Sequence, residues 1–320
     1  MKIAVLDAAT LDFPDEAWAG FRVLGDVTLH ALTPNDPALI RKNCAGAQIV
    51  LTNKVPLDAA TLAALPDLRI VAVLATGFNI VDAAAARAQG VAVCNAPGYS
   101  TASVAQHTVA LMLEWSNQVA LHNESVRAGD WVRSPRFSYW KTPLRELAGR
   151  TAGLIGFGAI GAQVGTILHA LGVNVLAHAR RRNNPPDWQP FAWAEIGEIF
   201  ERADIVSLHC PQTPENTRFV NAALLARMKP GALFVNTARG GLVDEAALAA
   251  ALRAGRPGAA ALDVLTQEPM RADCPLLGLP NCVITPHLAW ASEEARHRLL
   301  ALTLANVRAF LAGTPQNVVD

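Results

Sequence analysis

The sequence predicts an α/β protein with two domains, each built on a doubly wound parallel sheet. Short runs rich in Val, Ile and Leu recur along the 320 residues and alternate with helix-like segments. The runs are continuously apolar, which is typical of strands covered on both faces. The chain is also longer than the roughly 250 to 300 residues at which a single core stops growing. We therefore expect two strand and helix series.

The first series occupies about the first hundred residues. Its expected strands are KIAVLDA, AQIVLTN, LRIVAVLATG and VAVCNAPG, and helix-like segments such as VDAAAARAQ separate them. After Gly98 the segment STASVAQHTVALMLEWSNQVALHNESVRAG changes to helical periodicity, with Val104, Leu111, Trp115 and Val119 on one face. Ser and Thr residues at its start can cap a helix. We predict one long helix here, at a junction between domains.

The second series follows, with expected strands TAGLIGFG, VNVLAHA, DIVSLHCP, ALFVNTARG, ALDVL and NCVITPH. The final segment, SEEARHRLLALTLANVRAFLAG, is a helix with no strand series left to complete. We expect it to pack on the first domain. The first domain would then comprise residues 1–99 and 289–320, and the second, residues 100–288, would be inserted between crossings near Pro97 and Pro286.

Composition narrows the class of protein. Lys plus Arg (27) equals Asp plus Glu (27), so no long-range field attracts polyanions, and we expect no nucleic-acid partner. No window approaches the roughly 20 apolar residues that span a bilayer, and we expect no membrane association. The start, MKIAVLDA, is typical of an opening strand rather than an export signal. Five cysteines without a CxxC pair favour a reducing cytoplasm, and we predict no metal site.

A glycine-rich turn predicts the ligand of the second domain. GFGAIG follows the expected strand Thr151 to Ile155 and precedes the helix-like AQVGTILHALG. Glycines let the backbone approach a pyrophosphate, whose charge meets N–H groups at the helix start. A plain glycine turn is the alternative, but this context favours a dinucleotide-binding Rossmann domain. The residues of the turn are Gly156, Phe157, Gly158, Ala159, Ile160 and Gly161.

Three arginines follow the next strand. Enzymes that use NAD commonly place an acid at this strand end to bind the ribose 2′-hydroxyl, whereas this chain has Ala179. Without a carboxylate, Arg180, Arg181 and Arg182 can form charge-assisted hydrogen bonds to a 2′-phosphate. The sequence therefore predicts a preference for NADP(H), with NAD(H) possible, and Arg180 and Arg181 are the favoured contacts. A solvated basic loop is the alternative.

Three polar residues follow three later strands of the same series. Arg239 ends ALFVNTARG, Glu268 lies beyond ALDVL, and His287 ends NCVITPH. Each has an ordinary structural explanation: an arginine near a helix start, a loop glutamate, a paired interior histidine. Together they match the reduction of a 2-oxo acid, in which a histidine donates the proton, a carboxylate supports it and a guanidinium binds the substrate carboxylate. We predict these roles for His287, Glu268 and Arg239.

The motifs GFGAIG, VNTARGGLVDEAAL, ALDVLTQEP and TPHLAW stand in an order that resembles the D-isomer-specific 2-hydroxyacid dehydrogenases. The resemblance covers essentially the whole chain and implies a flavodoxin-like substrate domain that carries the Rossmann domain as an insertion. It also implies that Thr76 and Gly77, in LATGFN, offer N–H groups to the substrate carboxylate. Lys54, in LTNKVP, is a further candidate for binding a small anion, with a solvated lysine as the alternative.

By the same resemblance, further residues would border the cofactor. Asp263 would fix the nicotinamide amide, although buried support of Arg239 is a nearly equal alternative. The others are His209, Cys210, Pro211, Thr237, Ala238 and Ala289, together with Arg239 and His287 themselves.

Within the family, VLATGFNIVD, NAPGYSTASVAQHTVALML and FSYWKTPL resemble the glycerate dehydrogenase or hydroxypyruvate and glyoxylate reductase branch. Alternatives are a dehydrogenase for a bulkier 2-oxo acid and a dinucleotide-sensing corepressor-type protein on the same fold. The family implies a homodimer with the long helix and residues 131–147 at its interface. Trp140 would contact the partner's pocket or pack in its own core.

Overall fold

The computed structural model describes residues 1–319 and divides into two compact units. Unit 1 comprises residues 1–100 with the C-terminal segment from residue 291, and unit 2 comprises residues 101–290. The chain passes between the units after Ser100 and after Trp290, a few residues beyond Pro97 and Pro286. Each unit is described separately.

Unit 1 contains a five-stranded sheet in which every pairing is parallel. In sheet order its strands are β2 (Asp26–Leu29), β1 (Lys2–Val5), β3 (Ile49–Thr52), β4 (Ile70–Val73) and β5 (Ala92–Cys94). β3 and β4 are buried at every residue, because helices cover both faces of a parallel sheet. The order 2-1-3-4-5 is that of flavodoxin-like folds, as expected.

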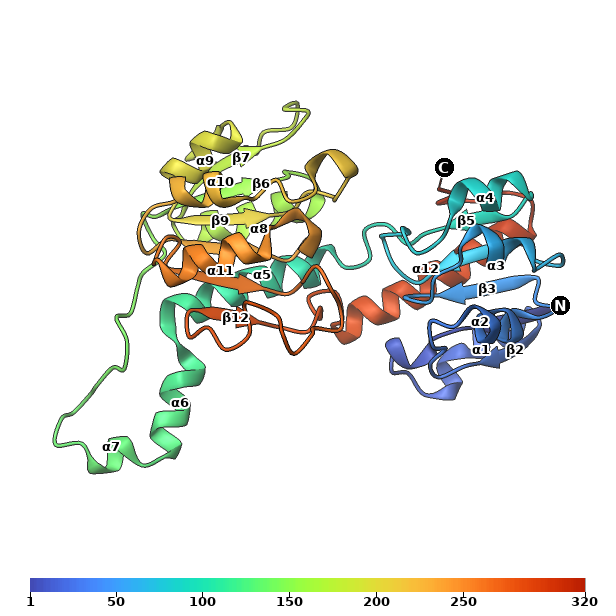
Figure 1. The fold of residues 1–320 in the computed structure, drawn as a ribbon, viewed down its shortest axis with the longest axis horizontal. Helices are drawn as coiled ribbons and strands as arrows, with labels where there is room; N and C mark the ends of the chain where they lie inside the picture. The colour runs from blue at the N-terminus through green and yellow to red at the C-terminus, as the bar shows by residue number, and fades with distance from the viewer. Residues whose placement is uncertain (320) are drawn as a thin grey trace. The chain divides into compact units, whose positions relative to one another are not determined.

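The helices of unit 1 alternate with these strands (Figure 1). They are the 3₁₀ turns η1 (Ala8–Thr10) and η2 (Asp15–Trp18), and α1 (Ala19–Arg22), α2 (Pro37–Cys44), α3 (Ala59–Ala63), α4 (Ala83–Ala88) and α12 (Glu293–Leu311). α12 begins after Ser292, whose hydroxyl accepts the amide N–H of Ala295, and it packs against β4. Asn306 of this helix donates to the carbonyl of Asn95. The last helix of the chain therefore belongs to the core of unit 1.

Unit 2 contains a seven-stranded parallel sheet, which confirms the expected second doubly wound domain. In sheet order its strands are β12 (Cys282–Ile284), β11 (Ala259–Leu262), β10 (Leu233–Asn236), β9 (Ile205–Leu208), β6 (Thr151–Ile155), β7 (Asn174–His178) and β8 (Phe191–Trp193). The strand order reverses between β6 and β9. The loops that follow these strands separate there and leave a crevice at the carboxyl edge of the sheet.

Helices of unit 2 cover both faces of its sheet (Figure 1). They are α5 (Thr101–Asn117), α6 (Val119–Arg127), α7 (Asp130–Arg133), α8 (Ala159–Ala170), α9 (Ile196–Arg202), η3 (Pro214–Asn216), α10 (Ala222–Arg227), η4 (Gly240–Leu242) and α11 (Glu245–Arg253). α5 and α8 pack against each other, and their apolar side chains share one core with β6, β9 and β10.

The expected single long helix after Gly98 is wrong. Gln118 adopts a left-handed conformation with φ of 50°, which ends α5 and redirects the chain into α6. Val104, Leu111 and Trp115 are buried as the helical spacing predicts, but Val119 is 63% exposed. The buried face therefore stops at the break, and α6 leaves the body of unit 2 with α7 (Figure 1).

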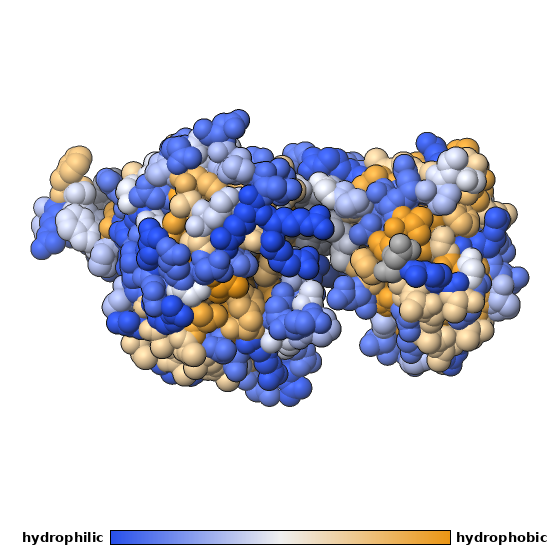
Figure 2. Space-filling view, turned by 90° about the horizontal axis from the view of Figure 1, so that it is seen from above, coloured by the Kyte–Doolittle hydropathy of each residue, from blue (hydrophilic) through white to orange (hydrophobic). Residues whose placement is uncertain are grey.

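Two strands, β2 and β8, were not expected from the sequence. Both lie at an edge of their sheet and are only partly buried. β2 (DVTL) mixes polar with apolar residues, and β8 (FAW) is only three residues long. Within residues 1–319, no helix combines the length and the hydrophobicity needed to span a bilayer. Hydrophilic side chains predominate on the face seen in Figure 2, with hydrophobic areas between them.

Candidate active site

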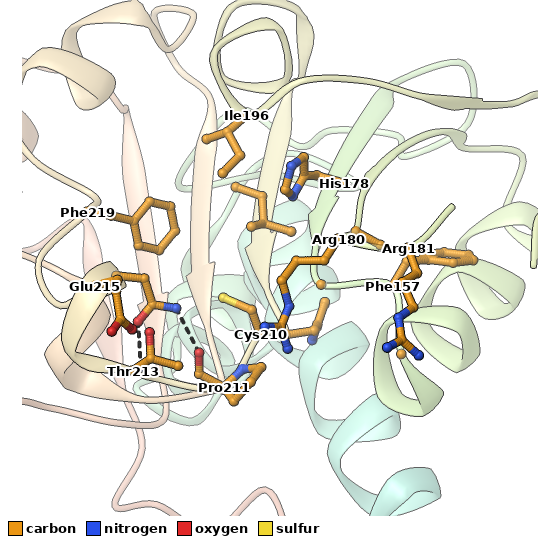
Figure 3. Close-up of a pocket in the computed structure, with 16 residues that line it drawn as sticks. Phe157, His178, Arg180, Arg181, Ile196, Cys210, Pro211, Thr213, Glu215 and Phe219 are labelled. Carbon is orange, nitrogen blue, oxygen red and sulfur yellow. Dashed lines mark hydrogen bonds between the residues drawn. The ribbon is translucent and has the colours of Figure 1, made fainter. Parts of the chain in front are cut away.

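A pocket of about 1110 Å³ opens in unit 2 where the strand order reverses. The loops after β6, β7 and β9 form most of its wall. Figure 3 shows the two arginines of the β7 loop on one side and Thr213, Glu215 and Phe219 on the other. The lining residues are Ile155, Gly156, Phe157, Gly158, His178, Ala179, Arg180, Arg181, Ile196, His209, Cys210, Pro211, Thr213, Glu215, Asn216 and Phe219.

The glycine turn has the geometry of a phosphate cradle. Gly156 has φ of 100°, and a Cβ there would lie 2.5 Å from the amide nitrogen of Cys210. A Cβ at Gly161 would collide with the carbonyl oxygen of Gly156, so this glycine lets α8 pack close to the turn. Gly158 caps α8 and lines the pocket, and its Cβ position faces open space. These features fit a dinucleotide whose pyrophosphate approaches the start of α8.

The three consecutive arginines do not share one environment. Arg180 and Arg181 line the pocket with Ala179, whereas Arg182 donates to Glu195 at 2.6 Å outside the lining set. Because residue 179 is alanine, no carboxylate stands at the end of β7, and the charged side chains of this part of the wall are the two arginines. The arrangement separates two arginines that could meet a phosphate from one with a structural ion pair.

His178 and the loop at residues 213–219 are pocket residues that the sequence analysis did not identify. His178 ends β7 directly before Ala179, and burial lowers the pKa of its imidazole. Thr213 and Asn216 form a capping box at η3, and the Asn216 side chain also donates to the carbonyl of Pro211 (Figure 3). The T-P-E-N pattern of that box was the available sequence signal.

His209, Cys210 and Pro211 follow β9 and line the same pocket. Burial lowers the pKa of His209 to about 4, so this imidazole is neutral at pH 7. Burial also raises the pKa of the Cys210 thiol. The strand end beside the glycine turn is therefore uncharged, and the positive charge of the pocket comes from the β7 loop.

The low pKa of His209 predicts a pH-dependent stability. An unfolded histidine titrates near 6.5, so the unfolded chain binds the proton first as the pH falls. The free energy of unfolding should therefore drop by about 3 kcal/mol between pH 7 and pH 4. Urea unfolding of the wild type and of His209→Asn at both pH values measures it. The variant should lack this part of the loss, and an identical loss in both proteins would contradict the assignment.

The remaining expected cofactor residues lie outside the pocket lining, among the residues described. Ala159, Ile160 and Gly161 form the first turn of α8. Thr237 and Ala238 follow β10, and the amide of Ala238 donates to the side chain of Asn236. The other four, Arg239, Asp263, His287 and Ala289, follow β10, β11 and β12.

The three polar candidates follow three adjacent strands. Arg239 comes after β10, Glu268 after β11 and His287 after β12, and the carboxyl ends of these parallel strands lie at one edge of the sheet. His287 Nδ1 lies 2.6 Å from a carboxylate oxygen of Glu268. The second oxygen of Glu268 accepts the amide N–H of Leu265. This pair orients the imidazole and leaves Nε2 as the nitrogen that can exchange a proton with a ligand.

Arg239 caps the short helix η4, and its side chain is exposed. Its Nη1 donates to the carbonyl of Ala238 at 2.6 Å. Asn236, which is buried, donates to the carbonyl of Arg239 and so fixes the turn that carries the guanidinium. The backbone of this turn is thus held firmly, and Arg239 stands at the same sheet edge as His287.

Asp263 is buried and holds the segment that carries His287. Its carboxylate accepts the Thr285 hydroxyl at 2.6 Å and the amides of Leu288 and Ala289 at 3.0 and 2.9 Å. Burial raises the pKa of Asp263, but hydrogen bonds, including one from His107, outweigh this and hold the pKa below its usual value. The carboxylate therefore acts on the 285–289 backbone, a role that neither alternative from the sequence included.

The candidate residues of unit 1 also lie at a carboxyl edge. Lys54 follows β3, and its amide donates to the buried carboxylate of Asp7 at 2.6 Å. Burial raises the pKa of Asp7 despite the opposing hydrogen bonds from this loop. Thr76 and Gly77 follow the neighbouring strand β4, and the Thr76 hydroxyl donates to the carbonyl of Ala96. Hydrogen bonds within unit 1 therefore hold both loops in place.

Trp140 is 66% exposed, so the alternative that it packs in the core of its own chain is wrong. It belongs to the segment 131–147, which is named here the arm. Together with α6, the arm extends away from the body of unit 2 (Figure 1). Val132 and Phe137 on the arm are 90% and 94% exposed. Large apolar side chains so exposed are typical of a surface that binds another protein.

Comparisons with known proteins identify the family of the chain. Residues 109–289 match the family model for the D-isomer specific 2-hydroxyacid dehydrogenase NAD binding domain. The chain is similar to a hydroxypyruvate reductase of Blautia hydrogenotrophica, 41% identical over the full length of both chains. It is also similar to a glycerate dehydrogenase of Methylorubrum extorquens, 43% identical over 89% of each.

Among solved structures, the fold matches an NADPH-dependent glyoxylate/hydroxypyruvate reductase of Sinorhizobium meliloti in complex with NADP and malonate. The TM-score is 0.84 at 29% identity, and the match covers 99% of this chain and 96% of the other. The relatives and this structure agree with the expected branch of the family.

Proposed function

Because this chain belongs to the D-isomer-specific 2-hydroxyacid dehydrogenases, we propose that it reduces a small 2-oxo acid to the D-2-hydroxy acid with NADPH. Membership makes it an NAD(P)-dependent oxidoreductase. Hydroxypyruvate and glyoxylate are the favoured substrates, on the strength of the two relatives and the Sinorhizobium structure. The observation that carries the proposal is the 2.6 Å contact between His287 and Glu268 at the sheet edge that also carries Arg239.

The proposed chemistry assigns one task to each side chain. A bound reduced dinucleotide would supply the hydride to the carbonyl carbon. His287 gives its Nε2 proton to the carbonyl oxygen, on which negative charge builds. Glu268 accepts from Nδ1 and stabilises the imidazolium before the proton leaves. Arg239 binds the substrate carboxylate through two parallel hydrogen bonds and also polarises the carbonyl.

Residues of unit 1 complete the proposal for substrate binding. We assign Thr76 and Gly77 to the substrate carboxylate through their N–H groups, as the family resemblance implies. Lys54 is assigned to a small anionic group of the substrate. The position of all three beyond β3 and β4 supports this, because ligands of open α/β sheets bind beyond the carboxyl ends of the strands.

The proposed NADPH preference rests on the wall formed by the β7 loop. The residues that would hold the dinucleotide are the glycine turn, the 209–211 segment and, for the 2′-phosphate, Arg180 and Arg181. Ala179 removes the carboxylate that would repel this phosphate. Asp263, Thr237, Ala238 and Ala289 would support the nicotinamide end, with Asp263 acting through the backbone it holds.

A panel of initial rates tests the proposal. Oxidation of NADPH and NADH is measured with glyoxylate, hydroxypyruvate, pyruvate and a bulky 2-oxo acid. We expect turnover with the two small substrates and a higher kcat/KM with NADPH. If kcat/KM is highest with the bulky acid, the enzyme is a dehydrogenase for a bulkier 2-oxo acid and the proposed substrates are wrong. Cofactor binding without turnover on any 2-oxo acid would instead favour a corepressor-type sensor.

We also propose that the chain forms a homodimer through its arm, with α5 and Trp140 at the interface. The exposed apolar side chains of the arm support this. Light scattering should give twice the chain mass of 33.9 kDa. Replacing both Val132 and Phe137 by aspartate should yield a folded monomer, because buried carboxylates without partners oppose association. A wild type that runs at the mass of one chain would refute the dimer.

A further inference from the structure

One face of α5 carries three polar side chains that form hydrogen bonds with the segments that follow β10 and β12. Ser103 donates to the carbonyl of Ala289 at 2.6 Å, and His107 Nε2 lies 3.1 Å from the hydroxyl of Thr285. One residue further, the Thr108 hydroxyl lies 2.8 Å from the hydroxyl of Thr237. The three are spaced i, i+4 and i+5, so they share a helix face, and their partners flank His287 and precede Arg239.

The direction of the His107 bond follows from its neighbours. The Thr285 hydroxyl donates its one proton to Asp263 at 2.6 Å, so its oxygen accepts from His107. His107 therefore carries a proton on Nε2, which also lies 3.5 Å from the same carboxylate oxygen of Asp263. The helix thus donates into the buried group that holds the amides of Leu288 and Ala289.

The backbone of His287 gives this network a specific task. His287 has φ of 52°, a left-handed conformation that is unfavourable for a residue with a side chain. Its amide donates to the carbonyls of Asp263 and Thr285, and the next two amides donate to the Asp263 carboxylate. This backbone persists because hydrogen bonds hold it on both sides of the strained residue.

We infer that His107 is a positioning residue that aims the imidazole of His287, through Thr285 and Asp263, and that Thr108 does the same for Arg239 through Thr237. The inference rests on the proposed roles of His287 and Arg239. Neither α5 residue touches the reacting atoms. One helix face sets the relative placement of the proton donor and the substrate-binding guanidinium, which come from different strands.

Kinetics of α5 variants separate this role from general stability. His107→Ala should lower kcat roughly 10- to 100-fold, the scale of a slightly misplaced catalytic group. The Kd for NADPH should change much less, because most of its proposed contacts lie in the separate pocket of the β6, β7 and β9 loops. His107→Gln should recover most of the rate, since its amide can donate to Thr285. Thr108→Val should mainly raise KM for the 2-oxo acid. His297→Ala, on an α12 histidine that is 59% exposed, is the control with wild-type rates.

A double-mutant cycle tests the path. If His107 acts through Thr285, then His107→Ala combined with Thr285→Val should be no slower than the slower single variant, because residues in one network are not additive. Thermal melting identifies variants that fold poorly. If His107→Ala is one of them, the same cycle is measured with His107→Gln and Thr285→Val. Independent and multiplying effects would overturn the proposed path.

Hydrogen exchange provides a readout that does not depend on turnover. In His107→Ala the amides of Leu288 and Ala289 should exchange about tenfold faster, the effect of losing about one hydrogen bond. If exchange is faster in His107→Ala but His287→Ala turns over normally, the hydrogen-bond network is supported and the proposed chemistry is rejected. A severe defect in His287→Ala, with His107→Ala unchanged in both kcat and exchange, would overturn the inference alone.

Discussion

Replacing His287 by alanine is expected to lower kcat for 2-oxo acid reduction by roughly 100- to 10,000-fold, the usual effect of removing a positioned proton donor. The carbonyl oxygen would then have to take its proton from water while hydride arrives. Binding of NADPH should change little, because His287 lies outside the lining of the dinucleotide pocket. Stopped-flow single turnovers with glyoxylate measure the chemical step without interference from product release.

Two companion variants make this result specific. Glu268→Gln keeps a group of similar size beside Nδ1 but cannot stabilise the imidazolium, so its defect should be smaller and should vary with pH. His297→Ala is the matched control, because this α12 histidine packs on Phe13 and lies near Glu293, both in unit 1. A His287→Ala enzyme that turns over at a near-normal rate would remove this histidine from the mechanism.

Replacing Arg180 and Arg181 together by alanine is expected to raise the Kd for NADPH by roughly two to four orders of magnitude. A hydrogen bond to a charged group contributes about 1.5 to 3 kcal/mol, which is roughly 10- to 100-fold for each arginine. Binding of NADH should change by less than about threefold, because it lacks the 2′-phosphate. Fluorescence titrations of both dinucleotides measure the two constants directly.

Arg182→Ala is the internal control for that experiment. It removes one positive charge from the same loop, but this arginine forms an ion pair with Glu195 and lies outside the pocket lining. Only a modest change in NADPH affinity is expected, of the size that a distant, screened charge gives. Equal losses for NADPH and NADH in the double variant would reject the phosphate-binding role of Arg180 and Arg181.

The two sheets could be predicted from the sequence because strands of a covered parallel sheet are apolar on both faces. β3, β4, β9 and β10 are buried at every residue, and each was expected. β2 mixes polar with apolar residues and β8 has only three residues, so neither gives the long apolar run that marked the other strands. The break at Gln118 could not be predicted, since no glycine or proline marks the left-handed turn.

The candidate site divides in a similar way. Motifs of adjacent residues could be recognised, such as the glycine turn and the arginine run. Arg182 lies outside the pocket because it pairs with Glu195, which stands at the start of α9. No local sequence pattern predicts that pairing. His107 and Thr285 are 178 residues apart, so their contact follows only from the packing of α5 beside β11. Asp263 showed the same limit, because its partners lie in the next strand's loop.

A crystal structure of the enzyme with NADP⁺ and a non-reducible 2-oxo acid analogue tests the central claim most directly. We predict that His287 Nε2 lies about 3 Å from the carbonyl-mimicking oxygen, with Nδ1 still on Glu268 and Arg239 paired with the carboxylate. An imidazole turned away from the analogue, in a complex where both ligands are bound, would contradict the proposed mechanism.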